Sequence, residues 1–297
     1  MKIFLTRSVS HLQRPLKKYG LYPGRTEIYA FADGEQGYRL RDDVEGESVG
    51  VIGSVLPDPH SLFDLIVLHH LVRENGAKET NLFVPYLGYA RQDRPTRPGE
   101  GSIGVMVVKL LQQSNPSRLT LIDVHSDLIR RVFEPPSQEL SALPLFAKAL
   151  ASRPPNVVVS PDAGYLSRAK QLAGLLDPHP LVAVIDKVRP RRDRAVAKYL
   201  HGDVRGKHVI IVDDIIDTGR TLIEAVKLVL REGARTVRLA ATHGIFSEGA
   251  RDRLSGLPID KILVTNTLPQ IRHPKIRTLD ISPLIRNALQ TPSNSYS

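Results

Sequence analysis

Two adjacent carboxylates and the polar loop after them are the residues of this chain best suited to chemistry. Asp213 and Asp214 end a short β-branched run, and the segment Leu222–Arg231 after the loop has the apolar spacing of a helix. Strand–loop–helix junctions are where open α/β sheets bind ligands, and free N–H groups at a helix start suit a phosphate. Because the carboxylates could also accept hydrogen bonds from sugar hydroxyls, the segment predicts a site for a phosphorylated sugar. The residues of this predicted site are Asp213, Asp214, Asp217, Thr218, Gly219, Arg220 and Thr221.

Helix capping is a simpler interpretation of the same segment. Asp217 or Thr218 could cap the helix, and the aspartate pair could be solvated. Capping explains any one of these residues, whereas the coincidence of two acids, a glycine and two threonines favours a phosphate-binding loop.

Two further segments carry groups that could bind a nucleotide. Phe31, Asp33 and Glu35 surround a glycine turn, where the ring could stack on a base and the acids could accept its amino protons. Taken alone, the segment is better explained as a β-turn with solvated acids. Arg91 and Gln92 follow a predicted strand and lead into a Pro/Gly-rich run. The arginine could clamp phosphates and the glutamine could bond a base or ribose, unless both are solvated.

Four more candidates stand at the ends of predicted strands. His125 could be a metal ligand or a phosphate contact, although a structural hydrogen bond is an open alternative. Asp162 occupies a position typical of acids that serve Mg²⁺, or it caps the next helix. Lys187 and Arg189 alternate past the strand Leu181–Ile185 and would point the same way on an extended chain. Two converging cations are what phosphoryl transfer needs, and a solvated basic edge is the alternative.

The composition limits the class of protein that these residues can serve. The 297-residue chain is long enough for two α/β domains, has no cysteine and shows no apolar run that could span a bilayer. With no signal-peptide core in its first residues, a soluble, cytoplasmic protein is expected. The net charge of +10 fits nucleic acid or phosphate ligands, but only 5% of the residues are aromatic and the charge is scattered outside 189–194. Small phosphate ligands are therefore favoured.

The elements that must position these residues follow from the hydrophobic pattern. Candidate strands are Lys2–Leu5, Ser48–Ile52, Asn81–Pro85, Leu119–Val124, Asn156–Ser160, Leu181–Ile185, His208–Val212, Thr236–Ala240, Lys261–Val264 and Arg277–Leu279. Amphipathic segments between several of them, such as Ser61–Glu74, Gly104–Gln113 and Tyr165–Leu176, predict crossover helices and parallel sheets. Ten strands are many for one sheet, so two sheets are expected. The prolines within 134–138 predict the domain boundary.

Six segments together resemble the motif series of ribose-phosphate pyrophosphokinases, from Lys2 to about Ile285. In chain order they read FADGE, YARQDR, DVH, SPDAG, DKVR and VDDIIDTGRT. The last one also resembles the loop that type I phosphoribosyltransferases use to bind 5-phosphoribosyl 1-diphosphate (PRPP), but those transferases share none of the others.

The resemblance implies an α/β protein with two phosphoribosyltransferase-like domains, 1–138 and 139–297, each a mostly parallel sheet flanked by helices. It implies a transferase of nucleotide biosynthesis that uses Mg²⁺ to move the β,γ-diphosphoryl group of ATP to O1 of ribose 5-phosphate. It also implies a homo-oligomer of dimers that share the ATP site. The implied roles are ATP binding for Phe31, Asp33, Glu35, Arg91, Gln92 and His125, metal binding for His125 and Asp162, sugar-phosphate binding for Asp213, Asp214 and Asp217–Thr221, and catalysis for Lys187 and Arg189.

Three rival functions stay open, and the chain also departs from the family pattern. The rivals are a phosphoribosyltransferase, a catalytically silent synthetase-like regulatory subunit, and a nucleic-acid-binding module. The departures lie in 126–133, after His125, and in the loop after Asp93, where Glu100 interrupts a segment that is usually more basic. The family's ADP and phosphate regulation and its hexamer are therefore not implied for this chain.

Overall fold

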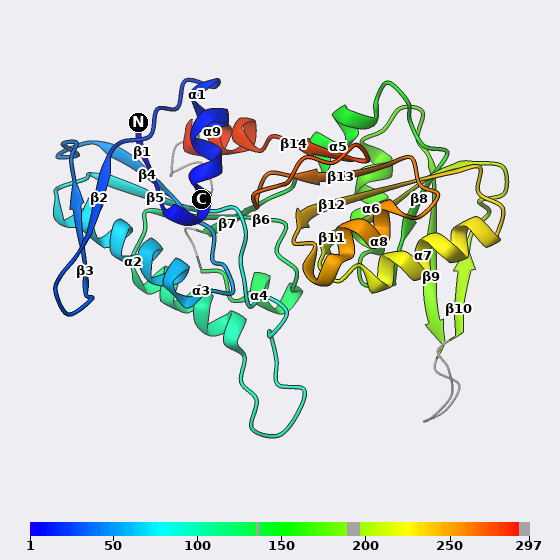
Figure 1. Cartoon of the computed structure of the whole chain (residues 1–297), viewed down its shortest axis with the longest axis horizontal. Helices are drawn as coiled ribbons and strands as arrows, with labels where there is room; N and C mark the ends of the chain where they lie inside the picture. Colours follow the sequence, from blue (N-terminus) through cyan, green and yellow to red (C-terminus); the bar gives the residue numbers. More distant parts are fainter. Residues whose placement is uncertain (135–136, 189–196, 291–297) are drawn as a thin grey trace. The chain divides into compact units, whose positions relative to one another are not determined.

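The fold divides into two compact units. The computed structural model of the chain describes residues 1–134, 137–188 and 197–290, without the side chains of 187–188 and 197–198. The first unit holds Met1–Ser141, Thr267–Pro269 and the chain from Asp280 on, and the second holds Ala142–Asn266 and Gln270–Leu279 (Figure 1). Each unit has its own sheet and its own core, so each is described by itself.

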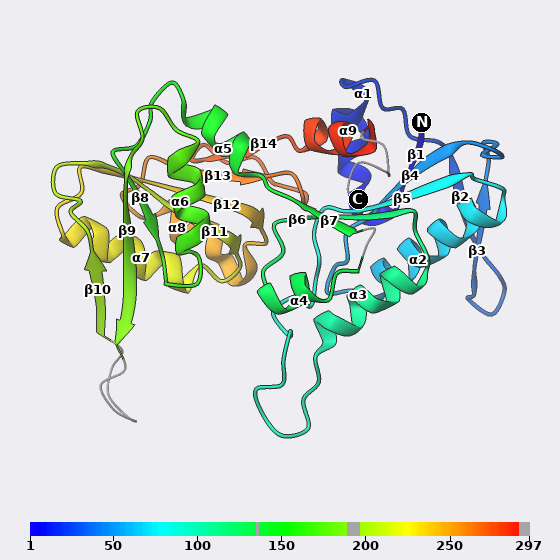
Figure 2. The same cartoon turned by 180° about the vertical axis from the view of Figure 1, so that it is seen from behind.

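The first unit is built on a five-stranded parallel sheet in the order β1-β4-β5-β6-β7. Its strands are β1 (Lys2–Leu5), β4 (Ser48–Ile52), β5 (Glu79–Val84), β6 (Arg118–Ile122) and β7 (Ser137–Leu140), and β2 (Thr26–Ala30) with β3 (Gln36–Leu40) forms a separate antiparallel hairpin. Its helices are α1 (Gln13–Lys17), α2 (Pro59–Glu74), α3 (Ile103–Gln113), α4 (Asp127–Arg131) and α9 (Ser282–Gln290), preceded by the 3-10 turn Arg7–Leu12. Figures 1 and 2 show α2 and α3 on one face of this sheet and α1 and α9 on the other.

Local sequence explains where the main helix of this unit begins and how it packs. Asp58 caps α2 by accepting a hydrogen bond from the His60 amide, and Pro59 stands at the first helical position, where its missing N–H costs nothing. The buried side chains Leu65, Leu68 and Val72 return every three to four residues and join the core of the sheet.

The last helix belongs to the first unit, although the predicted division at 138/139 places it in the second. Leu289 packs so closely on Gly50 of β4 that a Cβ there would lie 2.9 Å from its Cδ2 atom. Arg118, buried in β6, donates to the Ala288 carbonyl at 3.1 Å. These contacts form only in the folded chain, so they leave no local signal in the sequence. The chain first passes from one unit to the other after Ser141, because β7 pairs with β6 and extends the first sheet.

The second unit contains a seven-stranded sheet in the order β10-β9-β8-β11-β12-β13-β14, parallel except for the β9–β10 pair. Its strands are β8 (Val157–Ser160), β9 (Leu181–Val188), β10 (Ala197–His201), β11 (His208–Ile216), β12 (Thr236–Gly244), β13 (Lys261–Thr265) and β14 (Ile276–Leu279). Its helices are α5 (Leu143–Leu150), α6 (Leu166–Gly174), α7 (Arg220–Arg231) and α8 (Ala250–Ser255), with the 3-10 turn Ser247–Gly249 before α8. Leu222 and Val226 of α7 and Leu254 of α8 are buried in the hydrophobic core of this unit.

The prediction of an α/β fold with two mostly parallel sheets flanked by helices is confirmed, and all ten predicted strands are present. Their ends shift by up to four residues, most at β11 and β12, which continue to Ile216 and Gly244. Four strands were not predicted: β2, β3, β7 and β10. In the described part of the chain no helix has both the length and the apolar character needed to cross a membrane.

Candidate functional site

The order in which strands are added to the second sheet reverses between β8 and β11, and the predicted sugar-phosphate residues lie at that point. From β8 the chain adds β9 and β10 on one side, then returns to place β11 and the strands after it on the other side. Open α/β sheets bind ligands where the strand order reverses in this way, at the carboxyl ends of the strands. Asp162 comes two residues after β8, while Asp213 and Asp214 lie near the end of β11. The first sheet runs in simple order and has no such reversal.

The aspartate pair lies inside β11, which continues past it to Ile216. Asp214 is 6% exposed and Asp213 is half-buried. The Asp214 amide donates to Oδ1 of Asp213 at 3.0 Å. Burial, followed by the charge of Asp214 and, more weakly, of Asp162, raises the pKa of Asp213 well above its ordinary value. Burial and the two neighbouring carboxylates therefore oppose the ionisation of Asp213, a situation that hydrogen-bond donors or a cation would relieve.

The loop after β11 leaves the start of α7 open. Gly219 holds the N-cap position with a φ of +71°, a conformation that suits glycine, and it has no side chain with which to cap the helix. A Cβ at this position would also lie 3.0 Å from Cδ1 of Leu254. The first amides of α7 and the hydroxyls of Thr218 and Thr221 therefore surround a helix N-terminus of the kind that binds phosphate.

Residues after β12, which the sequence did not single out, support this loop. Arg253 donates to the carbonyl of Thr218 at 2.9 Å, and Glu248 forms a 3.3 Å ion pair with Arg220. Phe246 and Glu248 have φ values of +57° and +52°, which are costly for residues other than glycine. Such strain is most often found where a functional loop must keep one shape.

Lys187 lies in β9, because that strand continues to Val188 and past the predicted end at Ile185. Ser160, the last residue of β8, pairs with Val184, so β9 projects beyond the carboxyl edge of β8 and pairs only with β10 (Figure 1). At about 3.3 Å per residue, Lys187 stands roughly 10 Å past that edge. Arg189 lies outside the described residues.

The predicted adenine-binding residues occupy the tip of the β2–β3 hairpin. The amide of Phe31 donates to the carbonyl of Glu35 at 2.8 Å, and Gly34 turns with a φ of +93°. Asp33 accepts the amide of Glu35 at 3.0 Å. The ring of Phe31 is 52% exposed and meets the edge of Tyr29 at 5.3 Å between centroids. The tip thus presents an aromatic face and two carboxylates to solvent.

A buried carboxylate on α2 anchors the base of this hairpin. Asp64 accepts two hydrogen bonds from Arg7, both at 2.9 Å, and one from the hydroxyl of Tyr38 at 2.6 Å. Burial, together with the hydrogen bond to Asp64, raises the pKa of Tyr38 to about 12. The hydroxyl therefore stays protonated and remains a donor at neutral pH.

Replacing Asp64 by Ala is expected to lower the free energy of unfolding by about 2–3 kcal/mol, because Arg7 and Tyr38 lose their buried charged acceptor and keep the exposed amide oxygen of Gln36. Denaturant titration measures the loss. Glu74→Ala on the same helix is the control, because its pair with His70 is exposed on both sides and such pairs contribute little. Equal effects of the two substitutions would contradict the anchoring role of Asp64.

The remaining predicted ATP contacts lie in two loops of the first unit. Arg91 and Gln92 follow β5 and help to line a hollow of about 420 Å³ with Arg94, Thr96 and Glu100. Glu100, which departs from the family pattern, accepts the amides of Thr96 and Arg97 and the Thr96 hydroxyl, and so closes a turn in the loop. His125 is exposed just after β6.

The predicted metal ligands belong to different units, His125 to the first and Asp162 to the second. Asp162 accepts the amides of Gly164 and Tyr165 at 3.0 and 3.2 Å, so it also caps the turn before α6. Within residues 1–134, 137–188 and 197–290, no three His, Asp or Glu side chains are grouped to hold a metal ion. A cation bound at Asp162 would therefore need further ligands from water or substrate.

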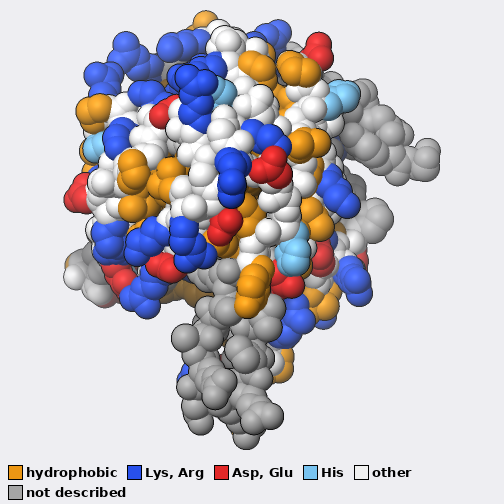
Figure 3. All heavy atoms as spheres, turned by 90° about the vertical axis from the view of Figure 1, so that its right-hand side faces the viewer, with side chains coloured by type: hydrophobic (Ala, Val, Ile, Leu, Met, Phe, Trp, Pro, Cys, Tyr) orange, Lys and Arg blue, Asp and Glu red, His pale blue; other side chains and the backbone are white. Residues whose placement is uncertain are grey.

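The described Lys and Arg side chains form no single stripe on the face drawn in Figure 3. Figure 3 shows Lys and Arg side chains spread over one face, with acidic and hydrophobic side chains between them. A nucleic-acid groove would concentrate its cations along one path. A carboxylate pair and an open helix start at the reversal point of a parallel sheet are instead suited to a phosphorylated sugar.

Comparison with known proteins identifies the family. A family model described as the N-terminal domain of ribose phosphate pyrophosphokinase matches residues 1–114, and one described as a phosphoribosyl synthetase-associated domain matches residues 180–297. The ribose-phosphate pyrophosphokinase of Aquifex aeolicus is 38% identical over 270 residues, covering 89% of this chain and 86% of the relative. That of Fusobacterium nucleatum is 34% identical, with 100% and 96% covered.

Solved structures agree with the sequence relatives. The crystal structure of phosphoribosylpyrophosphate synthetase from Mycobacterium smegmatis matches with a TM-score of 0.87 at 31% identity, covering 97% of each chain. The chain belongs to the ribose-phosphate pyrophosphokinase family. It is an enzyme with that activity, as the resemblance predicted.

Proposed function

We propose that this chain transfers the β,γ-diphosphoryl group of ATP to O1 of ribose 5-phosphate, which yields PRPP and AMP. The observation that supports it best is the loop between β11 and α7, with its paired carboxylates and open helix start at the reversal point of the second sheet. Phosphoribosyltransferases can share such a loop, so the substrates rest on the family and on the residues below.

Ribose 5-phosphate would bind at this loop. The amides at the start of α7, with the hydroxyls of Thr218 and Thr221, would hold the 5-phosphate. Asp213 and Asp214 would accept hydrogen bonds from the sugar hydroxyls, and those donors would relieve the charge repulsion that raises the pKa of Asp213. Arg220 and Asp217 would complete the loop around the phosphate.

ATP would be held by residues of the first unit. Phe31 would stack on adenine while Asp33 and Glu35 accept its amino protons, and the exposed hairpin tip is suited to do so in the site of a second subunit. Arg91, Gln92 and His125 would contact the nucleotide. A homo-oligomer built from dimers with shared ATP sites belongs to this proposal.

Magnesium fits the residues that are present. Mg²⁺ prefers oxygen ligands, keeps several waters, and is often held by one or two carboxylates together with substrate phosphates. Asp162 beside the Asp213–Asp214 pair supplies such a carboxylate, with His125 as the other proposed contact. When bound, the ion would neutralise charge on the phosphate oxygens of ATP.

The residues of the chain would act on the reaction mainly through charge and position. The sugar O1 attacks the β-phosphorus in line, the bond to the α,β-bridging oxygen breaks, AMP leaves with that oxygen, and the proton of the O1 hydroxyl passes to solvent. Negative charge then grows on the transferred oxygens and the leaving group, where Lys187, Arg189 and Arg91 would offset it. No general base is assigned, since orientation and charge neutralisation suffice for this step.

Turnover by the purified chain tests the proposal. With Mg²⁺, ATP and ribose 5-phosphate, chromatography is expected to show AMP and PRPP in equal amounts. ADP in place of AMP would mean ordinary kinase chemistry. An absence of turnover would favour the silent subunit, and turnover only with PRPP and a base would favour a phosphoribosyltransferase.

A further inference from the structure

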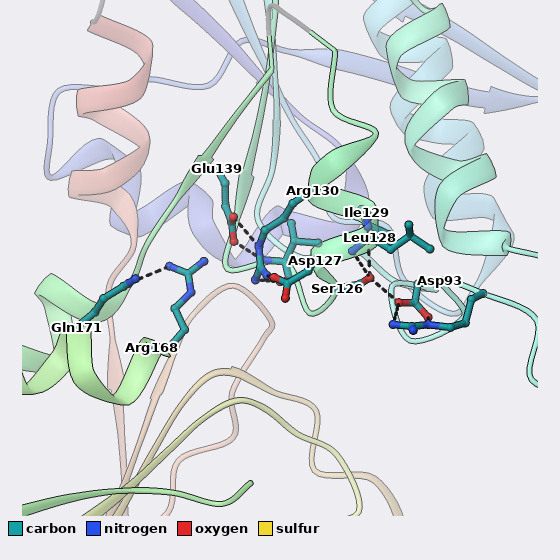
Figure 4. A network of polar contacts seen from close by, with 11 residues as sticks. Asp93, Ser126, Asp127, Leu128, Ile129, Arg130, Glu139, Arg168 and Gln171 are labelled. Carbon is teal, nitrogen blue, oxygen red and sulfur yellow. Dashed lines mark hydrogen bonds and ion pairs between the residues drawn. The ribbon is translucent and has the colours of Figure 1, made fainter. Parts of the chain in front are cut away.

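One hydrogen bond joins the two first-unit loops that the proposed function assigns to ATP. The hydroxyl of Ser126 donates to Oδ2 of Asp93 at 2.6 Å, and Figure 4 shows the two side chains facing each other. Gln92 directly precedes Asp93, and His125 directly precedes Ser126. We propose that Ser126 and Asp93 are positioning residues that lock these loops together in the arrangement that ATP requires. This inference rests on the proposed ATP roles of Gln92 and His125.

The hydroxyl of Ser126 has no freedom to turn away from Asp93. Its oxygen accepts the amides of Leu128 and Ile129 at 3.1 and 3.3 Å, so it caps α4. The side chain is buried, at 5% exposure. With its oxygen engaged by the helix, the hydroxyl has one proton to donate, and Asp93 receives it.

Asp93 stands on a backbone that is also fixed. The amide of Gln92 donates to the Tyr89 carbonyl at 2.8 Å, and the Gln92 carbonyl accepts the amide of Gly104 on α3 at 3.0 Å. Partial burial opposes ionisation of Asp93, but hydrogen bonds from Arg94 and Ser126 outweigh it and keep its pKa below the ordinary value. At neutral pH the acceptor is thus a carboxylate, which makes a stronger hydrogen bond than a neutral group.

A second set of contacts fixes the other neighbour of His125. The amide of Val124 donates to Oε1 of Glu139 on β7 at 2.8 Å, and Arg130 donates both to Glu139, at 2.8 Å, and to the Val124 carbonyl. The two neighbours of His125 are therefore both held, Val124 by Glu139 and Arg130, and Ser126 by Asp93. Figure 4 shows Glu139 beside Arg130 and Ser126 beside Asp93. The hydrogen bond between Ser126 and Asp93 reaches the Arg91–Gln92 loop.

The benefit of this link is preorganisation of the nucleotide site. Without it, each segment keeps its own contacts but loses the hydrogen bond that fixes one relative to the other, and ATP would have to fix their relative position on binding. Loss of the hydrogen bond should therefore weaken the binding of ATP. The affinity for ribose 5-phosphate, whose proposed site lies in the other unit, should not change.

Ser126→Ala tests the inference, with Ser126→Thr as the conservative variant and Ser114→Ala as a matched control. Ser114 ends α3 and donates to the carbonyl of Leu111 at 2.7 Å, so it is another helix-end serine of the same unit without a link to the ATP loops. For Ser126→Ala we expect the Kd of ATP, measured by calorimetry without ribose 5-phosphate, and the KM for ATP to rise about tenfold. The kcat and the KM for ribose 5-phosphate should stay within about twofold. Ser126→Thr should recover most of the ATP affinity.

Further outcomes separate the inference from the proposed function. If Ser126→Ala fails to fold, Asp93→Ala removes the same hydrogen bond without disturbing the helix cap and should weaken ATP binding similarly. An unchanged Kd of ATP in Ser126→Ala or Asp93→Ala, or an equal change in Ser114→Ala, would overturn the inference. A wild-type protein that binds ATP without turnover would contradict only the proposed function, because the Kd comparison still decides the role of Ser126. A wild-type protein that does not bind ATP would overturn both.

Discussion

Replacing Lys187 by Ala is expected to lower the kcat for AMP release by a factor on the order of a hundred or more, while both substrates still bind. The reason is that a cation facing the transferred diphosphoryl group matters most when charge grows in the transition state, and removing one such group typically costs a factor of this size. The position of Lys187 on the projecting part of β9, beyond the carboxyl edge of β8, agrees with that role. Single-turnover kinetics and calorimetry measure the two quantities separately.

Lys227→Ala is the control for this substitution. Lys227 lies on the exposed face of α7 in the same unit, where it pairs with Glu224 at 3.3 Å, and its loss should leave kcat unchanged. A wild-type kcat in Lys187→Ala would remove Lys187 from the catalytic group. An equal loss of kcat in both variants would show that the effect comes from the loss of a positive charge and not from the position of Lys187.

Asp213→Asn is expected to raise the KM for ribose 5-phosphate about tenfold to a hundredfold and, at neutral pH, to increase the free energy of unfolding. Hydrogen bonds from sugar hydroxyls to a carboxylate are stronger than those to an amide, which explains the loss of affinity. The gain in stability arises because burial and the neighbouring carboxylates oppose the charge of Asp213 in the folded protein. Initial rates with Mg²⁺ measure the KM, and denaturant titrations in EDTA measure the free energy of unfolding.

The sign of the pH dependence follows from the raised pKa of Asp213. Between its ordinary value of 3.8 and the higher value in the folded protein, the folded chain binds more protons than the unfolded chain. Stability therefore falls as the pH rises through that window, and the advantage of Asp213→Asn should be largest at neutral pH and disappear below about pH 4.

Asp203→Asn provides a control of opposite sign in the same unit. Lys207 donates to the carboxylate of Asp203 at 2.9 Å, and this hydrogen bond lowers the pKa of Asp203. Its loss should not stabilise the protein at neutral pH, nor should it alter the KM for ribose 5-phosphate. Destabilisation by Asp213→Asn at neutral pH would contradict the repulsion described for the aspartate pair.

The sequence predicted the strands that are apolar and β-branched, and it missed those that exist through pairing. β7 reads SQEL and has no hydrophobic pattern of its own, yet its four residues pair in parallel with β6. The β2–β3 hairpin is half-exposed on both strands, so its alternation is weak. β11 runs through two aspartates because β12 continues beside it, a tertiary effect that outweighs the low strand propensity of Asp.

The candidate site could be predicted where one short segment carries several reactive groups in a fixed order. The residues from Asp213 to Thr221 meet this condition, and the structure places them at the reversal point of the sheet. The groups that support the site were not predictable, because each acts across a long stretch of chain. Asp64 holds Arg7 over 57 residues, Ser126 reaches Asp93 over 33, and Arg253 reaches Thr218 over 35. None of them stands in a pattern that local sequence could reveal.

The central claim is that O1 of ribose 5-phosphate attacks the β-phosphorus of ATP. ATP labelled with ¹⁸O at the α,β-bridging position tests it most directly, because attack at that phosphorus breaks the bond between the β-phosphorus and the bridging oxygen. After turnover by the wild-type chain with Mg²⁺ and ribose 5-phosphate, ³¹P NMR is expected to show the label in AMP and none in PRPP. Label in the diphosphate of PRPP, or its appearance in ADP, would contradict the claim.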